Sequence, residues 1–416
     1  MDFLERVDPE VARIIHAERK RQATTLELIA SENHVSAAVL EAMGTVLTDK
    51  YAEGYPGRRW YCGCENMDSI EQLCIDRAKK LFHAEHANVQ PHSGTSANLA
   101  VYMAALQPGA KIMGMNLAHG GHLSHGRKQN ISGMFYKAVH YGVSEGTETL
   151  DMNLVREQAL KEKPDMLVCG ASSYPRTIDF AAFGQIAREV GCPLLCDIAH
   201  IAGLVVGGVH PDPVPVSDFV TTTNHKTLRG PRGGIILSKA IWADKLDAAV
   251  FPGIQGGPLE HVIAAKAVAL EEASHPTFMN YASAIIANAK ALSEALMSLG
   301  WRLVTGGTDN HMVLIDLRSR FEDIDGHMAA IWLSQASIVC NKNAIPFDTR
   351  SPLRPSGIRL GTPAVTTRGL TPRDMKQIAA WIDQILTSGG NEDIITKVSE
   401  GVEEICRAHP VPNSSY

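Results

Sequence analysis

The feature that most constrains the fold is an alternation of short β-rich runs with helical patterns between about residues 85 and 240. Several of the runs are apolar along their whole length, as expected for strands that are covered on both faces. Strands that alternate with helices predict a mainly parallel sheet wrapped by helices. The runs are Ala87–Gln90, Lys111–Met115, Met134–Val143, Met166–Gly170, Pro193–Asp197, Phe219–Thr223 and Gly234–Ser238. Ligands bind at the carboxyl ends of such strands, so the residues that end these runs are candidates for a site.

Helical patterns dominate both flanks of this region. Asp8-Pro9-Glu10 supplies a cap, a proline at the first helical position and a first-turn acid, and Ser69-Ile-Glu-Gln72 is a capping box before a helix that we expect to run to Phe82. A long helical pattern covers 258–300, and the remainder predicts a smaller α+β unit. We therefore expect an N-terminal helical arm (1–50), a large α/β domain (51–280) and a small C-terminal α+β domain (281–416).

Composition excludes several classes of protein. The 416 residues carry a net charge of −6, which argues against a nucleic-acid footprint. No stretch of about 18 uncharged apolar residues occurs, so we expect no membrane span. The N-terminus lacks the apolar core of a signal peptide, and the eight cysteines are widely spread, which together predict a reducing, cytoplasmic setting.

Several familiar motifs are missing. No GxGxxG follows a strand, and His225 stands where a P-loop would need glycine before Lys226-Thr227. His119, His122 and His125 are spaced by three residues, but no neighbouring carboxylate or cysteine accompanies them in the sequence. We therefore predict no metal site.

Three segments point to one cofactor. The turn Pro91–Asn98 could cradle a phosphate at a helix N-terminus, although a plain capping turn is an alternative. Asp197 ends a buried strand and could pair with a cationic ring nitrogen, or cap a helix. Lys226 follows another strand, where burial among cations would suit Schiff-base chemistry. A sheet domain that binds pyridoxal-5′-phosphate (PLP) requires a particular order along the chain. It has a phosphate turn, an Asp about 100 residues later and a Lys about 30 residues after that, as here.

Nine segments, in order over about residues 20 to 390, resemble one family, the serine hydroxymethyltransferases. They are Leu28–Asn33, Lys50–Gly57, Gln90–Gly94, Leu117–Leu123, Asp197–Gly203, His225–Gly234, Phe251–Pro258, Gly306–His311 and Ser356–Arg359. The resemblance implies an α/β fold of the fold-type I (aspartate aminotransferase-like) PLP transferases, with PLP as cofactor and tetrahydrofolate as co-substrate.

The resemblance also implies a role for each site residue. Lys226 would carry the cofactor, and Asp197 would keep its ring nitrogen protonated, while Arg359 would bind the substrate carboxylate. The implied catalytic residues are Lys226, Glu53, His225, Tyr51 and Tyr61; the cofactor-binding ones are Ser93, Gly94, Thr95, His122, Ser172, Asp197, His200, Lys226, Gly256 and Gly257; the substrate-binding ones are Ser31, Tyr61, His200 and Arg359; and the folate-binding ones are Glu53, Trp60, Leu117, Gly121, Leu123 and Asn343.

In this family Tyr51, Glu53, Gly256 and Gly257 come from the neighbouring subunit, which implies a homodimer, or a tetramer built from dimers. The implied reaction is reversible retro-aldol transfer of a hydroxymethyl group between serine, or 2-methylserine, and tetrahydrofolate, giving glycine or D-alanine. The alternative is a folate-independent aldolase of the same family that acts on 2-methylserine or other β-hydroxy amino acids.

Four positions depart from the family pattern. Trp60 stands in place of tyrosine, Cys62 in place of glycine, Thr95-Ser96 in place of Ser-Gln, and Asn224 in place of threonine. Neutral drift and a preference for 2-methylserine both account for these changes. We expect Thr95 and Asn224 to lie beside the reacting centre, where a changed side-chain volume alters which Cα substituents fit.

Overall fold

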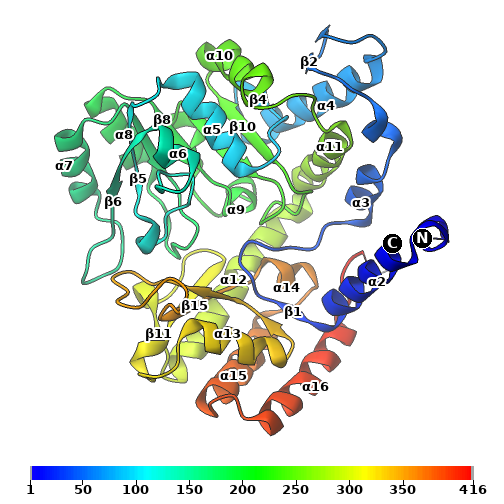
Figure 1. The fold of residues 1–416 in the computed structure, drawn as a ribbon. Helices are drawn as coiled ribbons and strands as arrows, with labels where there is room; N and C mark the ends of the chain where they lie inside the picture. The colour runs from blue at the N-terminus through cyan, green and yellow to red at the C-terminus, as the bar shows by residue number, and fades with distance from the viewer. Residues whose placement is uncertain (1, 414–416) are drawn as a thin grey trace.

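The computed structural model describes residues 2–413. The predicted arm and C-terminal domain include Met1 and residues 414–416, which lie outside the described residues. A seven-stranded sheet forms the centre of the larger part of the molecule (Figure 1). Its order is β4 (His86–Asn88), β10 (Gly234–Ser238), β9 (Phe219–Thr223), β8 (Leu194–Asp197), β7 (Met166–Cys169), β5 (Lys111–Met115) and β6 (Lys137–Tyr141). Only β10 runs against its neighbours. The predicted α/β class with a mainly parallel sheet is therefore confirmed.

The two faces of this sheet enter two different cores, because successive side chains on a strand point in opposite directions. Met166 and Val168 of β7 pack in a cluster with α5 (Gly94–Ala105) and α10 (Ala243–Ala248). Leu167 and Cys169 of the same strand pack in the other cluster. The helices that supply that second cluster are α4 (Glu65–Phe82), α7 (Met152–Glu162), α8 (Phe180–Val190), α11 (Glu260–Ser274) and the first half of α12 (Pro276–Ser298). Burial on both faces explains why these strands are apolar throughout.

A second, antiparallel sheet lies in the C-terminal part, in the order β11 (Arg302–Leu303), β12 (Met312–Asp316), β15 (Gly357–Gly361) and β14 (Asn341–Asn343). It shares a core with α13 (Gly326–Gln335), α15 (Pro372–Thr387), α16 (Glu392–Ala408) and the second half of α12. The N-terminal segment joins this core, because β1 (Leu26–Glu27) pairs in parallel with β13 (Ile338–Val339).

Three local predictions were wrong. The pattern at 258–300 forms two helices, α11 and α12, because Pro276 supplies no backbone N–H to continue the first. Ser69 does not begin a helix: it lies inside α4, and its hydroxyl donates to the carbonyl of Glu65 one turn earlier. The strand predicted at Met134–Val143 is shorter, because the Asn130 side chain caps α6 (Ile131–Phe135) ahead of β6.

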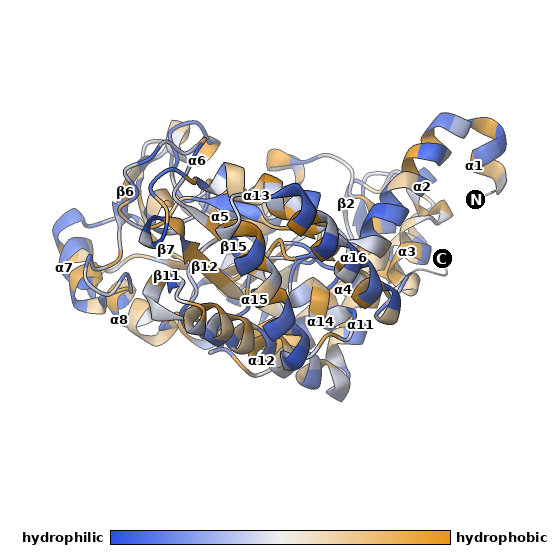
Figure 2. Cartoon of the chain, turned by 90° about the horizontal axis from the view of Figure 1, so that it is seen from below, coloured by the Kyte–Doolittle hydropathy of each residue, from blue (hydrophilic) through white to orange (hydrophobic). Residues whose placement is uncertain are grey.

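The arm begins with α1 (Asp2–Val7) and α2 (Pro9–Thr24), the latter capped by Asp8 as predicted. These two helices project from the body of the molecule (Figure 2). Phe3, Val7, Val11 and Ile14 on them are exposed. Within residues 2–413, no helix combines the length and apolar character needed to cross a membrane.

Candidate active site

Lys226 lies in a cavity of about 460 Å³ at the carboxyl ends of the central strands. The chain folds into this arrangement because β7, β8 and β9 are parallel neighbours whose carboxyl ends lie at the same edge of the sheet. The predicted residues that line the cavity are Ser31, Ser93, Gly94, Thr95, His122, Ser172, Asp197, His200, His225, Lys226 and Arg359. Glu32, Ala171, Ala199, Thr223 and Arg232 line it as well.

The Lys226 side chain is buried at the start of a tight turn. Its backbone carbonyl accepts hydrogen bonds from Asn33 Nδ2 at 2.8 Å and from the Arg229 N–H at 3.2 Å, which fixes the turn. Burial lowers the pKa of the amine to about 8; Asp197 opposes this shift, whereas the positive charges of Arg359 and Arg232 add to it. A larger fraction of the amine is therefore neutral at pH 7 than in a free lysine, as a nucleophile needs.

Asp197 is held as a carboxylate by three donors. Its Oδ2 accepts from His125 Nε2 and Asn98 Nδ2, each at 2.9 Å, and its Oδ1 accepts from the Ala199 N–H at 3.0 Å. Burial opposes ionisation, but the hydrogen bond and charge of His125 outweigh it and hold the pKa of Asp197 well below its usual range. The alternative that Asp197 caps a helix is wrong, because Ile201 is the N-cap of α9 (Ala202–Val206).

The histidines that the sequence places together serve separate contacts. His119 Nδ1 accepts from the Val143 N–H at 3.1 Å. His122 pairs through Nδ1 with Ser124 Oγ at 2.7 Å, and burial lowers its pKa to about 4. His122, His125 and Asp197 offer three possible metal-ligand atoms within 4.8 Å of one another, so a carboxylate does join the histidines in space. However, the His125–Asp197 hydrogen bond already uses one atom of each residue.

Ser93 begins α5, and the capping-turn alternative is confirmed as a description of the local structure. Its Oγ accepts from the Ser96 N–H at 3.2 Å, while Ser96 Oγ accepts from the Ser93 N–H at 2.9 Å. Gly94 is required by close packing, because a Cβ there would lie 2.8 Å from Thr223 Cγ2. A helix N-terminus that opens into the cavity attracts an anion, so capping and phosphate binding are compatible here.

Arg359 enters the cavity from β15 of the C-terminal sheet. Its Nε donates to Asn341 Oδ1 at 3.0 Å, and its Nη1 donates to the carbonyl of Ser172. Burial lowers its pKa to about 10, so it remains a cation at neutral pH. No carboxylate within residues 2–413 forms an ion pair with it. A buried cation without a counter-ion is costly, and a carboxylate on a ligand would satisfy it.

Three more histidines, His200, His311 and His225, lie near Lys226. His200 Nδ1 is 3.4 Å from His311 Nε2, with the rings stacked. Burial, followed by the charges of Lys226 and Arg359, lowers the pKa of His200 well below its usual value. Burial also lowers the pKa of His225 to about 3, with Arg232 and Lys226 contributing. These histidines are therefore neutral over the physiological pH range.

Six predicted residues gather elsewhere, in a second cluster that does not line the Lys226 cavity. This cluster consists of Tyr51, Glu53, Trp60, Tyr61, Gly256 and Gly257. The Tyr51 and Tyr61 rings meet edge to face with centroids 5.3 Å apart, and the charge of Glu53 raises the pKa of Tyr61. A Cβ on Gly257 would lie 3.2 Å from Tyr51 Cε1, and one on Gly256 would lie 3.6 Å from Glu53 Oε1. Trp60 is 76% exposed.

Of the other predicted folate residues, Leu117, Gly121 and Leu123 follow β5, whereas Asn343 belongs to the C-terminal sheet. Leu117 and His122 share the lining of a neighbouring pocket of about 210 Å³. Gly121 is packed so closely that a Cβ would lie 2.1 Å from the Met115 carbonyl oxygen. Leu123 is 43% exposed, and Asn343 lies on β14 beside the strand that carries Arg359.

Asn224 does not lie where the sequence suggested. It is 1% exposed but does not line the Lys226 cavity. A Cβ on Gly230 or on Gly233 would lie 3.1 Å from its side chain, which places Asn224 beneath the Gly/Pro-rich loop after Lys226. Its side-chain oxygen and nitrogen are buried without hydrogen-bond partners. Asn224 can therefore affect substrate choice only indirectly, whereas Thr95 faces the cavity.

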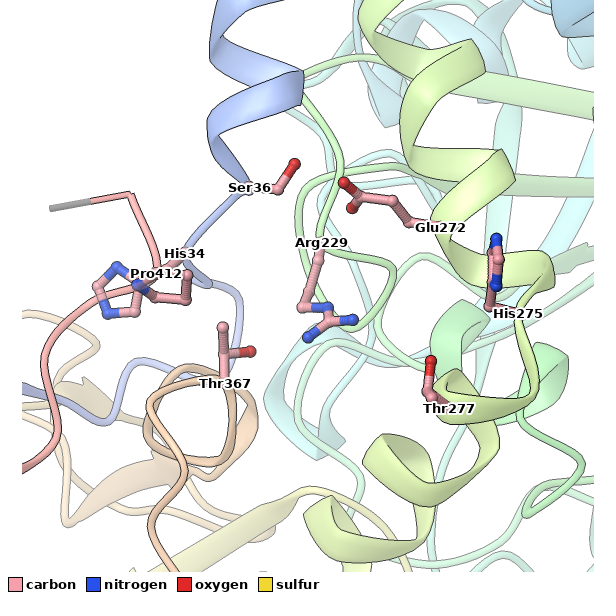
Figure 3. Close-up of a pocket in the computed structure, with 8 residues that line it drawn as sticks. All are labelled: His34, Ser36, Arg229, Glu272, His275, Thr277, Thr367 and Pro412. Atoms are coloured by element: carbon pink, nitrogen blue, oxygen red, sulfur yellow. The ribbon is translucent and has the colours of Figure 1, made fainter. Parts of the chain in front are cut away.

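A separate cavity of about 330 Å³ is lined by Arg229, three residues after Lys226, and contains none of the predicted site residues (Figure 3). Arg229 points into it with its guanidinium 3.9 Å from the centre of the Tyr281 ring. Tyr281 and Thr367 both bond to Asn33, which holds the Lys226 carbonyl. This cavity therefore borders the framework of the turn and not the reacting centre.

Sequence reasoning missed Asn98, His125 and His311 as functional residues. Asn98 lies one helical turn beyond Gly94, and it also accepts from Thr221 Oγ1 at 2.6 Å. The sequence indicates His125 only as a possible metal ligand. Its position three residues after His122 was the one available signal, but nothing in the sequence shows that Asp197 lies next to it.

The geometry fits PLP. An amine with a lowered pKa, an ionised aspartate with lone pairs to spare, a helix N-terminus and an unpaired arginine share one cavity at the carboxyl edge of the sheet. The architecture is that of the fold-type I PLP enzymes, an α/β class in which a large, mostly parallel sheet is joined to a smaller C-terminal sheet. Within that class, the family model described as serine hydroxymethyltransferase matches residues 4–382. The chain belongs to that family, whose members are hydroxymethyltransferases that use PLP with tetrahydrofolate as co-substrate.

Proposed function

We propose that this enzyme moves a hydroxymethyl group between tetrahydrofolate and a serine-type amino acid, either serine/glycine or 2-methylserine/D-alanine. The observation that carries the proposal is the buried Arg359, which shares a cavity with Lys226 and forms no ion pair with a carboxylate of residues 2–413. An α-amino acid whose carboxylate binds Arg359 places its amino group and Cα inside this cavity. The proposed domains, 51–280 and 281–416, would thus each supply one end of the amino-acid site.

The bound cofactor supplies an electron sink for the negative charge that develops on Cα when the bond to the hydroxymethyl carbon breaks. Around it we assign roles to the residues of the chain. The ionised Asp197 would hold the ring nitrogen and keep a proton on it, and His125 and Asn98 keep Asp197 ionised. Ser93, Gly94 and Thr95 would hold the phosphate at the N-terminus of α5, and Ser172, which lines the same cavity, would contact the cofactor. His122 lines the same cavity and would pack against the ring.

On the substrate side, Lys226 would hold the cofactor when no amino acid is bound, and its amine of lowered pKa could hold or release a proton at its own nitrogen. His200 and His225 are neutral and act as hydrogen-bond partners rather than as fixed charges. Arg359 and Ser31 orient the carboxylate. Orientation decides which Cα bond breaks, so a small displacement of Arg359 has a large effect on rate.

We further propose that the site is shared between two copies of the chain. The second cluster contains all four residues that the family takes from its neighbour, and it exposes Trp60 and the ring of Tyr51. The apolar side chains on α1 and α2 are exposed too. Large exposed apolar side chains that lie close together mark association surfaces. In a dimer with twofold symmetry the second cluster of each copy would complete the Lys226 cavity of the other. Glu53 would then move protons, with Trp60, Leu117, Gly121, Leu123 and Asn343 around the folate.

The choice between the two substrate pairs is tested by measuring tetrahydrofolate-dependent turnover of L-serine and 2-methyl-L-serine side by side. The favoured substrate is the one with the larger kcat/KM. Failure to turn over either would overturn the proposal. Cleavage of 2-methylserine at the same rate without tetrahydrofolate would instead identify a folate-independent aldolase. Thr95→Ser provides the matched variant, because Thr95 faces the cavity and the change removes only a methyl group.

A further inference from the structure

Lys266 is a fully buried lysine outside the Lys226 cavity. It lies on α11 and is 1% exposed. Its Nζ donates to the carbonyls of Val89 at 2.6 Å, Gly234 at 2.9 Å and Pro91 at 3.1 Å. An ammonium group has three donors, and all three are used on backbone oxygens.

These three carbonyls surround the base of the turn that begins α5. Val89 follows β4, Gly234 begins β10, and Pro91 lies two residues before Ser93. The Gly234 N–H also donates to the Pro91 carbonyl at 2.9 Å, and a Cβ on Gly234 would lie 2.6 Å from the Ser93 carbonyl oxygen. Lys266 therefore ties together the three backbone segments from which the turn emerges.

The surroundings of Lys266 are arranged for a cation. Burial lowers the pKa of its amine to about 8, and Cys74, Glu71 and Glu260 oppose that shift. Glu71 and Glu260 form ion pairs with Arg59 at 2.8 and 3.5 Å, and Gln90 donates to Glu71 at 2.8 Å. An apolar side chain of the same length would leave three buried carbonyls with fewer partners, which is costly.

We propose that Lys266 is a positioning residue for cofactor binding: its ammonium holds the turn 91–95 in the shape that binds the cofactor phosphate and adds positive potential behind it. The inference rests on the proposed role of Ser93, Gly94 and Thr95 at the phosphate. Lys266 acts through the backbone and touches neither substrate nor cofactor.

The test compares a phosphorylated ligand with its unphosphorylated counterpart. Pyridoxine 5′-phosphate and pyridoxine both lack the aldehyde, so neither reacts with Lys226, and their dissociation constants on the apoenzyme report non-covalent binding alone. Lys266→Met should weaken binding of pyridoxine 5′-phosphate roughly tenfold or more, while binding of pyridoxine changes far less. Lys290→Met is the matched control, because Lys290 is an exposed lysine on the next helix.

A second variant covers the case in which Lys266→Met does not fold, as judged by circular dichroism. In Gly233→Ala the new Cβ would lie 2.5 Å from Lys266 Cε and 3.1 Å from its Nζ, so the ammonium is displaced but not deleted. The same selective loss of pyridoxine 5′-phosphate binding is expected. Equal weakening of both ligands, or no weakening, overturns the role of Lys266. If wild-type protein binds both ligands equally well, the phosphate turn itself is wrongly assigned, and the proposed cofactor site fails first.

Discussion

The Lys226 cavity and the second cluster both contain predicted site residues, but in opposite environments. In the cavity, burial and fixed hydrogen bonds shift the pKa values of Lys226, Asp197 and His200. In the second cluster, Trp60 and Tyr51 are exposed. Groups that are buried and paired within one chain are preorganised by that chain. The exposed aromatic side chains of the second cluster are not fixed in this way, and a second protein surface that covered them would bury and orient them. The difference fits the site that we propose, in which one copy of the chain would prepare the cofactor end and a second copy would complete it.

The largest expected effect on activity comes from replacing Lys226 in the Lys226 cavity. Lys226→Ala should lower kcat by at least about 10³-fold, because general acid–base steps alone contribute 10²–10⁴-fold. The protein should also lose the visible absorbance of covalently held PLP while keeping its circular dichroism. Turnover close to wild type in this variant would remove Lys226 from the mechanism.

Mixing two inactive variants tests the comparison directly. Glu53→Gln damages the second cluster, and Lys226→Ala damages the cavity. If each site combines the Lys226 cavity of one copy with the second cluster of the other, a mixed dimer has one intact site and one doubly damaged site. Random exchange makes about half of the dimers mixed. About a quarter of wild-type activity should therefore return. Activity is measured after partial denaturation and refolding of the mixture.

A matched mixture sets the baseline for that experiment. Lys226→Ala mixed with Arg359→Ala damages the same cavity in both copies, so no intact site forms and no activity should return. Recovery in both mixtures, or in neither, would contradict a site shared in the way proposed.

Arg359→Ala should act on the amino acid and spare the cofactor. Loss of a buried charged partner costs at least about 2 kcal/mol, which corresponds to roughly thirtyfold weaker binding of serine or glycine. The measurement is the spectral titration of the PLP-loaded enzyme with each amino acid. Arg359→Lys keeps the charge but not the planar pair of donors, so it should recover only part of the loss. Unchanged amino-acid affinity in Arg359→Ala would disprove the carboxylate assignment.

The sheet could be predicted well from the sequence because its strands are buried on both faces. Phe219–Thr223, Lys111–Met115 and Gly234–Ser238 were predicted to the residue. Helix boundaries were harder, since the Ser69 capping box has the right residues but lies inside α4, where Ser69 bonds to Glu65. Local capping signals cannot show that the chain is already helical before them.

The site, too, has residues that the sequence identifies and contacts that it does not. Lys226, Asp197 and Arg359 follow from strand ends and motif resemblance, and the structure brings them into one cavity. The contact of His125 with Asp197 joins residues 72 positions apart, and that of Lys266 with Pro91 joins residues 175 apart. Such pairs depend on how the sheet is stacked against its helices, which no local pattern encodes. Asn224 illustrates the converse: it adjoins His225 in sequence, yet it does not line the cavity.

The smallest expected effect is a pH dependence of the rate at which the Lys226 cavity takes up PLP. Lys226 must be neutral to attack the aldehyde of PLP, and its pKa is lowered to about 8. A base with that pKa becomes neutral as pH rises, so the neutral fraction grows about fivefold between pH 7 and pH 8 and then levels off. Stopped-flow loading of the apoenzyme should follow this curve. A midpoint near the pKa of free lysine, about 10.4, would mean that burial does not activate the amine. Because Arg359 adds to the lowering, Arg359→Ala should move the midpoint upward. A variant in the second cluster, such as Trp60→Ala, should leave the midpoint unchanged. Loading kinetics would then report on the Lys226 cavity and not on the second cluster.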